Sequence, residues 1–226
     1  MTTTTDVLIV GAGIAGLMCA LECAKFGLKV TVFYSGDVGH SSSAYAQGGI
    51  ACAWNPNDSP SNHAQDTLIA GDGLCDANIV SSICKSGPPI IDQLIHLGVP
   101  FDESGGSFSL TKEGGHSHSR IFHVKDHTGD AIVKALSAQC NDHADIALVN
   151  GVVHGLIQSN NGQILGVLVN NESIIAPVTV LATGGYSSLY SHATNPSGMV
   201  SNGIAMAHAA GAILSNLEFI QFHPTV

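Results

Sequence analysis

The chain of 226 residues is long enough for one large domain or two small ones, and its 45% hydrophobic residues are sufficient for a buried core. Only 11% of the residues are charged, and the formal net charge is −10, with seven Lys and Arg in all. So few basic residues argue against a nucleic-acid partner, which would require them clustered on one surface.

The first 34 residues predict a parallel βαβ unit. A buried strand over residues 6–10 leads into the turn GAGIAG, a helix with apolar residues at helical spacing follows until Gly27, and VTVF begins a second strand. Gly11, Gly13 and Gly16 have the dinucleotide-binding spacing, which allows a tight turn, a close approach of a pyrophosphate and helix–strand packing. The acidic residue that usually binds the ribose after the second strand is absent, because Ser35 stands there.

The apolar segment 7–21 is too short to span a membrane, contains three glycines and has no basic residue before it. No other segment is long enough to insert. The six cysteines include no CxxC pair and lie mostly in apolar runs, which is typical of reduced core thiols. We therefore expect a cytoplasmic protein with no membrane partner.

The middle of the chain predicts a polar loop up to residue 62 and then helices. Helical patterns are expected over residues 64–69, from an N-cap at Asp76, and over residues 128–140. Pro88 and Pro89 are expected to end the second of these and to start a further helix, which Gly98 caps. From residue 146 to 181 the pattern predicts β-structure: VVHGLI and ILGVLV joined by the turn SNNG, then the buried strand in APVTVLATGG.

The segment TKEGGHSHSR, residues 111–120, raises a question about Glu113. Two adjacent glycines open unusual backbone conformations and allow a close approach to a flat ligand, so an acid beside them can meet a charged group. Taken alone, the same segment is typical of a solvated loop. His116, His118 and His123 are spaced like metal ligands, but no Cys or carboxylate accompanies them at ligand spacing, so we predict no metal site.

Six motifs in order, GAGIAG, AYAQGGIA, TKEGGHSHSR, VLATGGY, NGIAMAHAAGA and EFIQFHPT, resemble the N-terminal part of the L-aspartate oxidase family, within the fumarate reductase and succinate dehydrogenase flavoprotein superfamily. The resemblance implies an α/β fold, a doubly wound parallel sheet forming a Rossmann-like FAD-binding domain with a β-meander. This domain would occupy residues 1–226, with the last residues leading into a capping domain. Because the family's proteins are much longer and its substrate-binding arginines lie in that capping domain, we expect these 226 residues to be an incomplete and inactive part of such a protein.

The resemblance implies FAD as the cofactor, held without a covalent bond. Membrane-bound relatives attach FAD to a histidine at the position of Ser42, and His40 is out of register with it. Asn202 stands where the family has an aspartate. The residues expected to contact FAD are Gly11, Ala12, Gly13, Ile14, Ala15, Gly16, Ser35, Ser42, Ser43, Ala44, Tyr45, Ala46, Gln47, Gly48, Gly49, Val153, Thr183, Gly184 and Asn202.

The implied reaction is oxidation of L-aspartate to iminoaspartate for quinolinate and NAD biosynthesis, with hydride passing from Cα to flavin N5 and oxygen or fumarate as acceptor. Quinolinate synthase is an implied partner. Glu113 would pair with the substrate ammonium, and Gln221 and His223 match the family's substrate-side residues. Two alternatives stay open. The first is a soluble fumarate reductase or succinate-oxidising flavoprotein, for which the resemblance implies an apolar residue before Gly114. The second is a non-catalytic nucleotide-binding remnant, which the chain length favours.

Overall fold

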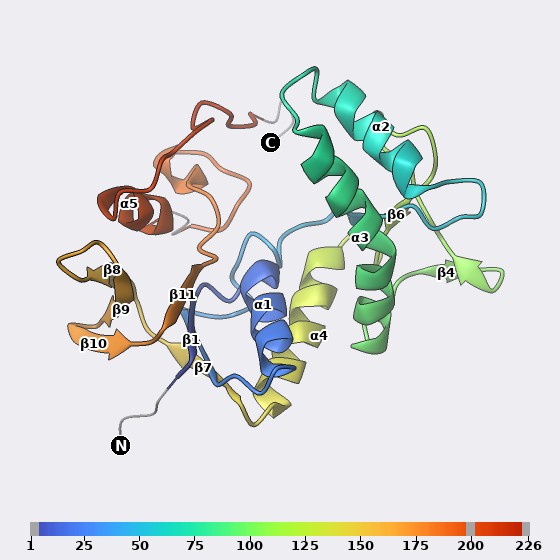
Figure 1. Cartoon of the computed structure of the whole chain (residues 1–226). Helices are drawn as coiled ribbons and strands as arrows, with labels where there is room; N and C mark the ends of the chain where they lie inside the picture. The colour runs from blue at the N-terminus through green and yellow to red at the C-terminus, as the bar shows by residue number, and fades with distance from the viewer. Residues whose placement is uncertain (1–4, 198–201, 223–226) are drawn as a thin grey trace. The chain divides into compact units, whose positions relative to one another are not determined.

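The computed structural model describes residues 5–197 and 202–222 (Figure 1). The chain forms two compact units. The first consists of Met1–Tyr45 together with Leu136–Val226, and the second is the continuous segment Ala46–Ala135. The helix α4 (Thr128–Asp142) contains the later of the two boundaries.

A parallel four-stranded sheet forms the centre of the first unit, with the strand order β11-β1-β2-β7. Its strands are β1 (Val7–Val10), β2 (Val30–Tyr34), β7 (Ile146–Asn150) and β11 (Val178–Leu181). All four residues of β1 are buried, as expected for a central strand covered on both faces. The predicted parallel sheet is confirmed.

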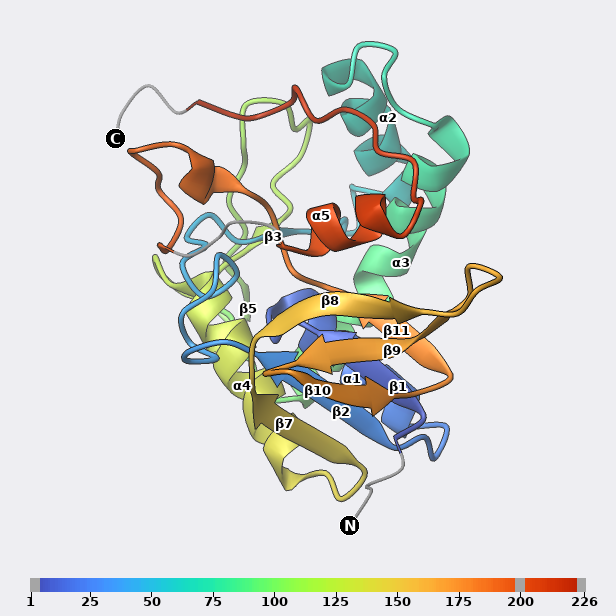
Figure 2. The same cartoon turned by 90° about the vertical axis from the view of Figure 1, so that its left-hand side faces the viewer.

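One face of this sheet packs on a three-stranded antiparallel meander, β8 (Val153–Gln158), β9 (Ile164–Val169) and β10 (Glu172–Ile175). Leu8 and Val10 form one core cluster with Val167 and Val169 of the meander. The helix α5 (Asn202–Ala209) lies beside β8 and adds Met206 to the same cluster (Figure 2). The predicted hairpin is confirmed, whereas β10 was missed because its four residues ESII lack a clear alternation.

The other face of the sheet is covered by α1 (Ile14–Ala24). Leu17 and Ala20 of this helix are fully buried, and the Cys140 thiol lies 3.6 Å from the backbone oxygen of Leu17. Burial raises the pKa of Cys140 to about 11. Such a thiol stays protonated and unreactive at neutral pH, in agreement with the expected role of the cysteines in the core.

Two helices and short strand pairs build the second unit. The helices α2 (Pro60–Ala70) and α3 (Ala77–His96) pack through Ala64, Val80 and Cys84. The strand pairs are β3 (Ile50–Ala51) with β6 (Ile121–Phe122), and β4 (Glu103–Ser104) with β5 (Ser107–Phe108). Aromatic rings of Trp54, Phe101, Phe108 and Phe122 meet at centroid distances of 5.2–5.9 Å and form this unit's aromatic core.

The predicted helix break at Pro88 and Pro89 is wrong, because α3 continues through both residues. A proline ring fixes φ near the helical value, so two adjacent prolines fit the helix at the expense of the hydrogen bonds their missing N–H groups would have made. Val80 and Cys84 before the prolines, and Ile91 and Leu94 after them, are buried residues of the same helix. Burial of apolar side chains on both sides of the prolines thus outweighs the lost hydrogen bonds. The predicted N-cap at Asp76 is confirmed, because its carboxylate accepts the N–H groups of residues 78 and 79.

Within the described parts of the chain, none of the helices is both long enough and apolar enough to cross a membrane.

Candidate functional site

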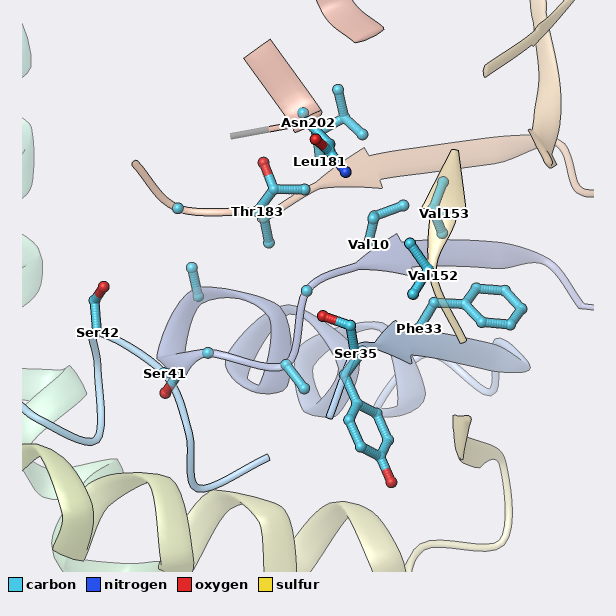
Figure 3. Close-up of a pocket in the computed structure, with 18 of the residues that line it drawn as sticks. Val10, Phe33, Ser35, Ser41, Ser42, Val152, Val153, Leu181, Thr183 and Asn202 are labelled. Carbon is cyan, nitrogen blue, oxygen red and sulfur yellow. The ribbon is translucent and has the colours of Figure 1, made fainter. Parts of the chain in front are cut away.

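A cavity of about 510 Å³ lies in the first unit, at the carboxyl ends of its parallel strands. Its lining comes from the residues that follow β1, β2, β7 and β11, from α5, and from the loop between residues 37 and 43. Figure 3 shows the side chains of Ser35, Ser42 and Thr183 around the glycine turn that connects β1 to α1. In open α/β sheets, this edge is where ligands bind.

The glycines of the turn are required by close backbone contacts. Gly11 has a φ of +113°, and a Cβ atom there would lie 2.3 Å from the backbone oxygen of Ala182 in the second glycine turn. A Cβ atom on Gly16 would lie 1.9 Å from the backbone oxygen of Gly11. Both distances are far below van der Waals contact, so the turn between β1 and α1 can form only with glycine at these two positions.

The amino end of α1 has the chemistry of an anion site. The first N–H groups of a helix have no acceptor within the helix, and the helix dipole places partial positive charge there. Gly13 is the N-cap, and its backbone is extended. The Ser43 hydroxyl lies beside Gly13 and accepts the N–H of Ile14 at 3.2 Å. No acidic residue occupies the first turn. The charge at this end of the cavity therefore suits a pyrophosphate.

The side chains around the cavity are mostly apolar or hydroxylic. Tyr34, Asp37 and His40 are the titratable side chains among the described lining residues, and no Lys or Arg is among them. Asp37 Oδ1 accepts the N–H of Gly39 at 3.0 Å, which stabilises the loop after β2. An anion in this cavity would thus depend on backbone N–H groups, hydroxyls and the helix dipole for its binding.

Eleven of the residues predicted to contact the cofactor line the cavity: Gly11, Ala12, Gly13, Ala15, Ser35, Ser42, Ser43, Val153, Thr183, Gly184 and Asn202. Ile14 and Gly16, in the first turn of α1, and Ala44 and Tyr45, in the same unit, are not part of the lining. The other four, at residues 46–49, belong to the second unit.

Sequence reasoning missed the other lining residues, among them Asp37, Val38, His40, Ser41, Gly151, Val152 and Leu181. A signal for some of them was present. The residues after a buried parallel strand lie at the ligand-binding edge, and Gly151 and Val152 directly follow such a strand, β7. The sequence pattern predicts one β-region through LVNG, and this pattern alone does not show that a parallel strand ends there.

Residues 46–49 of the second unit are fixed by their surroundings. Gly49 has a φ of +109°, and a Cβ atom there would lie 2.3 Å from the backbone oxygen of Phe122 in β6. The Thr128 hydroxyl lies 3.4 Å from the Gln47 backbone oxygen, and the Gly129 N–H donates to the Ala46 oxygen at 2.9 Å. Glycine at position 49 thus has a packing reason of its own, beside the predicted approach to a flavin.

In the segment 111–120, Glu113 is exposed at a tight turn. Its backbone oxygen accepts the N–H of His116 at 3.0 Å, with Gly114 and Gly115 between them. The base of the loop is closed by Thr111, whose backbone oxygen accepts the N–H groups of Arg120 and Ile121, both at 3.0 Å. Glu113 therefore lies at the end of a closed hairpin loop.

Arg120 is fully buried and joins two carboxylates beneath this loop. Its Nε and Nη2 atoms donate to the two oxygens of Asp58 at 2.9 Å each, and Nη1 donates to Asp66 at 2.6 Å. Burial alone would raise the pKa of Asp58, but the hydrogen bonds from Arg120 and the Ser59 N–H and the nearby positive charge hold that pKa below its usual value. The N–H of Ser117, its hydroxyl and Arg120 hold the pKa of Asp66 far below its usual value.

The three histidines that follow Glu113 have three separate neighbours. The His116 ring meets His63 edge to face at 6.0 Å, His118 Nδ1 lies 3.5 Å from Asp58, and His123 Nδ1 lies 3.1 Å from Asp102. In residues 5–197 and 202–222, no group of three or more His, Cys, Asp and Glu side chains is arranged to hold a metal. The carboxylates near these histidines were not found from the sequence because they come from distant segments.

The predicted substrate residues at the end of the chain are described only in part. Gln221 is exposed, and His223 lies outside the described residues.

Comparisons with known proteins cover nearly the whole chain. A family described as FAD binding domain matches residues 6–226. The chain is 41% identical over 238 residues to an L-aspartate oxidase of Vibrio cholerae serotype O1, covering 97% of this chain and 44% of that protein. It is 40% identical to an L-aspartate oxidase of Streptomyces coelicolor, covering 98% of this chain and 40% of the relative. The chain thus spans about two fifths of the length of these curated relatives.

Solved structures share the fold of this chain. A structure of Mycobacterium smegmatis Sdh1 in complex with UQ1 superposes with a TM-score of 0.90 at 32% identity, covering 98% of this chain and 40% of that one. A quinol-fumarate reductase with menaquinol molecules superposes with a TM-score of 0.87 at 27% identity, covering 93% of this chain and 38% of that one.

Proposed function

Because the chain belongs to the FAD-binding-domain family, we propose that it is the FAD-binding part of an L-aspartate oxidase, which oxidises L-aspartate to iminoaspartate. The observation that carries the choice of substrate is Glu113, directly before a pair of glycines, in a chain whose curated relatives are aspartate oxidases. A carboxylate at this position pairs with the ammonium group that distinguishes L-aspartate from succinate. It would also leave succinate facing an unpaired charge, which discriminates by more than shape.

The cofactor proposal assigns the cavity of the first unit to the dinucleotide. The glycine turn and the first N–H groups of α1 hold the pyrophosphate, and the Ser43 hydroxyl already bonds to this end of the helix. Ser35, directly after β2, takes the place of the usual ribose-binding acid. Thr183, Gly184, Val153 and the Asn202 amide complete the contacts from the other strand ends.

Ser42 supports non-covalent binding of FAD. A serine hydroxyl forms no counterpart of the histidyl–flavin bond, and Ser42 lines the cavity. The predicted flavin loop continues through residues 44–49, where Gln47 has an amide that can donate and accept hydrogen bonds.

In the proposed reaction, the chain's own residues bind and orient the substrate. Bound FAD supplies the acceptor for the hydride that leaves Cα. Glu113 accepts hydrogen bonds from the ammonium group, and the Gln221 amide, with His223, donates to a substrate carboxylate. Holding Cα in a reactive orientation is the protein's main contribution to the rate.

We further propose the cellular setting that follows from this activity. Iminoaspartate is consumed by quinolinate synthase in NAD biosynthesis, so that enzyme is the proposed partner, and oxygen or fumarate reoxidises the cofactor. A cytoplasmic location suits the six cysteines, all of which are free thiols. Reduction of fumarate as the main activity is the second candidate, supported by the fold shared with the quinol-fumarate reductase structure.

The test uses the full-length protein that carries this chain. In Glu113→Gln the shape is kept and the charge is lost, and a hydrogen bond to a charged group contributes about 1.5–3 kcal/mol, so kcat/KM for L-aspartate should fall roughly 10- to 100-fold. Fumarate has no ammonium group, and its reduction should change by less than about twofold. Glu103→Gln, at an exposed glutamate in β4 of the same unit, is the matched control and should change neither reaction. Equal loss of both reactions in Glu113→Gln would contradict the proposed substrate, and so would no loss in either.

A further inference from the structure

The loop that carries Glu113 is held by a carboxylate from a helix far away in the sequence. Asp66 lies in α2, and its Oδ2 atom accepts three hydrogen bonds: from the Ser117 N–H at 2.7 Å, from the Ser117 hydroxyl at 2.8 Å and from Arg120 Nη1 at 2.6 Å. Ser117 follows directly after the turn formed by residues 113–116. One side-chain oxygen of Asp66 thus binds both Ser117, next to the turn, and Arg120, at the end of the loop.

Arg120 in turn fixes Asp66. The guanidinium group is fully buried and forms a two-pronged pair with Asp58, whose side chain is also fully buried. Such a planar pair holds both groups in one orientation. Nη1 of the same guanidinium donates to Asp66, so the buried pair also fixes the Asp66 carboxylate, and Asp66 in turn fixes Ser117.

Two more contacts restrain the residues on each side of Glu113. Lys112 Nζ donates to the Ser117 backbone oxygen at 3.2 Å, and the ring of His116 meets that of His63 in α2 edge to face at 6.0 Å. The Glu113 carboxylate itself has no hydrogen-bond partner among the residues that the structure describes. The loop is therefore tied down everywhere around Glu113, while the carboxylate stays free to meet a ligand.

We propose that Asp66, supported by Arg120 and Asp58, is a positioning residue for Glu113, so that the selectivity for an ammonium-bearing substrate depends on a carboxylate that never touches the substrate. This inference rests on the proposed function, because it takes Glu113 as the residue that pairs with the ammonium group. A binding group held in place before the ligand arrives loses little freedom on binding. A loosened turn would have to order Glu113 in each binding event, which weakens the binding of the ammonium group alone.

The experiment compares Asp66→Asn with wild type in the full-length protein that carries this chain. Asparagine keeps the size of the side chain but removes the charge that holds the Ser117 N–H, its hydroxyl and Arg120 together. We expect kcat/KM for L-aspartate to fall roughly 5- to 50-fold and its dissociation constant, from the change in flavin absorbance, to rise. Fumarate reduction and the dissociation constant of succinate should change by less than about twofold. Asp130→Asn, which breaks the 2.7 Å surface pair with Lys134 in α4, is the matched control and should leave all four values unchanged.

A double variant separates positioning from general damage. In the Glu113→Gln background there is no carboxylate left to position, so adding Asp66→Asn should lower kcat/KM for L-aspartate by no more than about twofold. If Asp66→Asn does not fold, Ser117→Ala replaces it. That change leaves the Ser117 N–H bond to Asp66 in place and removes the hydroxyl, which donates to Asp66 and also contacts His118 Nδ1 at 2.9 Å and Arg120 Nη2 at 3.4 Å. It should give a smaller loss of a few-fold that is again confined to L-aspartate.

The positioning role would be overturned, with the proposed function left intact, by an equal loss of L-aspartate and fumarate turnover in Asp66→Asn or by a full additional loss on top of Glu113→Gln. Unchanged L-aspartate kinetics in Asp66→Asn would overturn it as well. If Glu113→Gln alone shows no loss confined to L-aspartate, the substrate assignment itself is wrong, and the positioning role is overturned with it.

Discussion

Replacement of Arg120 by methionine should strongly destabilise the protein, because it removes the only positive charge hydrogen-bonded to Asp58 among the described residues. Methionine keeps much of the apolar volume of the arginine stem, so the change tests the guanidinium group. In the wild type, that group makes three bonds of 2.6–2.9 Å to the two aspartates and a longer one of 3.4 Å to the Ser117 hydroxyl.

The size of the loss of stability depends on the exposure of the two aspartates and on the hydrogen bonds that they retain without Arg120. The Asp58 side chain is 0% exposed and retains the Ser59 N–H and a longer contact of 3.5 Å with His118 Nδ1. The Asp66 side chain is 13% exposed and retains both bonds from Ser117. Removing one partner of a buried ion pair costs about 3–5 kcal/mol, because the other charge stays buried without compensation. We expect Arg120→Met to lower the free energy of unfolding by about 3–4 kcal/mol, with most of the loss coming from Asp58.

The measurement is urea unfolding followed by circular dichroism, with Lys25→Met as the control. Lys25 forms an exposed pair with Glu22, and its replacement should cost less than about 1 kcal/mol. The double variant Arg120→Met with Asp58→Asn should be more stable than Arg120→Met alone, since the uncompensated charge is gone. A double variant that is less stable than Arg120→Met, or a loss no larger than that of the control, would refute the reasoning.

The same cluster predicts a pH dependence. The folded-state pKa values of Asp58 and Asp66 both lie below the usual aspartate value, so their contribution to stability is present above the unfolded-state pKa, about 3.9, and is lost as pH falls. Wild type should therefore lose stability between roughly pH 5 and pH 3, and Arg120→Met should lose less over the same range. Urea unfolding at a series of pH values measures this difference. A steeper acid loss in the variant would contradict the assigned role of the guanidinium.

Three further experiments test the cavity and the fold. Gly16→Ala should abolish FAD binding, because its Cβ atom would lie 1.9 Å from a backbone oxygen, whereas Gly155→Ala in β8, with nothing within 4 Å, should leave the FAD affinity from fluorescence titration unchanged. Acid precipitation should release all of the flavin into the supernatant, since Ser42 forms no flavin bond; colour left in the pellet would contradict non-covalent binding. Pro88→Ala should stabilise the protein to urea by about 1 kcal/mol, because it restores an N–H in the interior of α3; a loss of stability would mean that the rigidity of proline matters more there than the hydrogen bond.

The parts of the fold set by local sequence could be predicted. The turn GAGIAG after an apolar strand, the N-cap at Asp76 and the SNNG turn between two β-segments each depend on residues within a few positions of one another. The prolines of α3 show where such reasoning fails. Pro88 and Pro89 are poor residues for a helix by themselves, and only the burial of Ile91 and Leu94 in the folded unit keeps the helix continuous.

The candidate site could likewise be predicted only where its residues belong to a local sequence motif. The glycine turn indicated the edge of the sheet at which the cavity lies, but the residues after β7 and in the loop after β2 that complete the cavity come together only through the strand order. The sequence alone assigns no role to Arg120. Its partners Asp58 and Asp66 are 62 and 54 residues away, so no local pattern linked them to it.

The strand order of the first unit has a consequence for biosynthesis. The central strand β1 ends at Val10, yet its neighbour β11 ends at Leu181, so one side of β1 has no partner until the segment between these two strands has been made. At about 5–20 residues per second, this wait lasts on the order of 10–40 s. The continuous segment Ala46–Ala135 can fold in the meantime, while an apolar strand edge stays open. Nascent chains stalled before residue 178 should therefore engage chaperones that bind extended apolar segments, and release from them should coincide with the emergence of β11 from the ribosome.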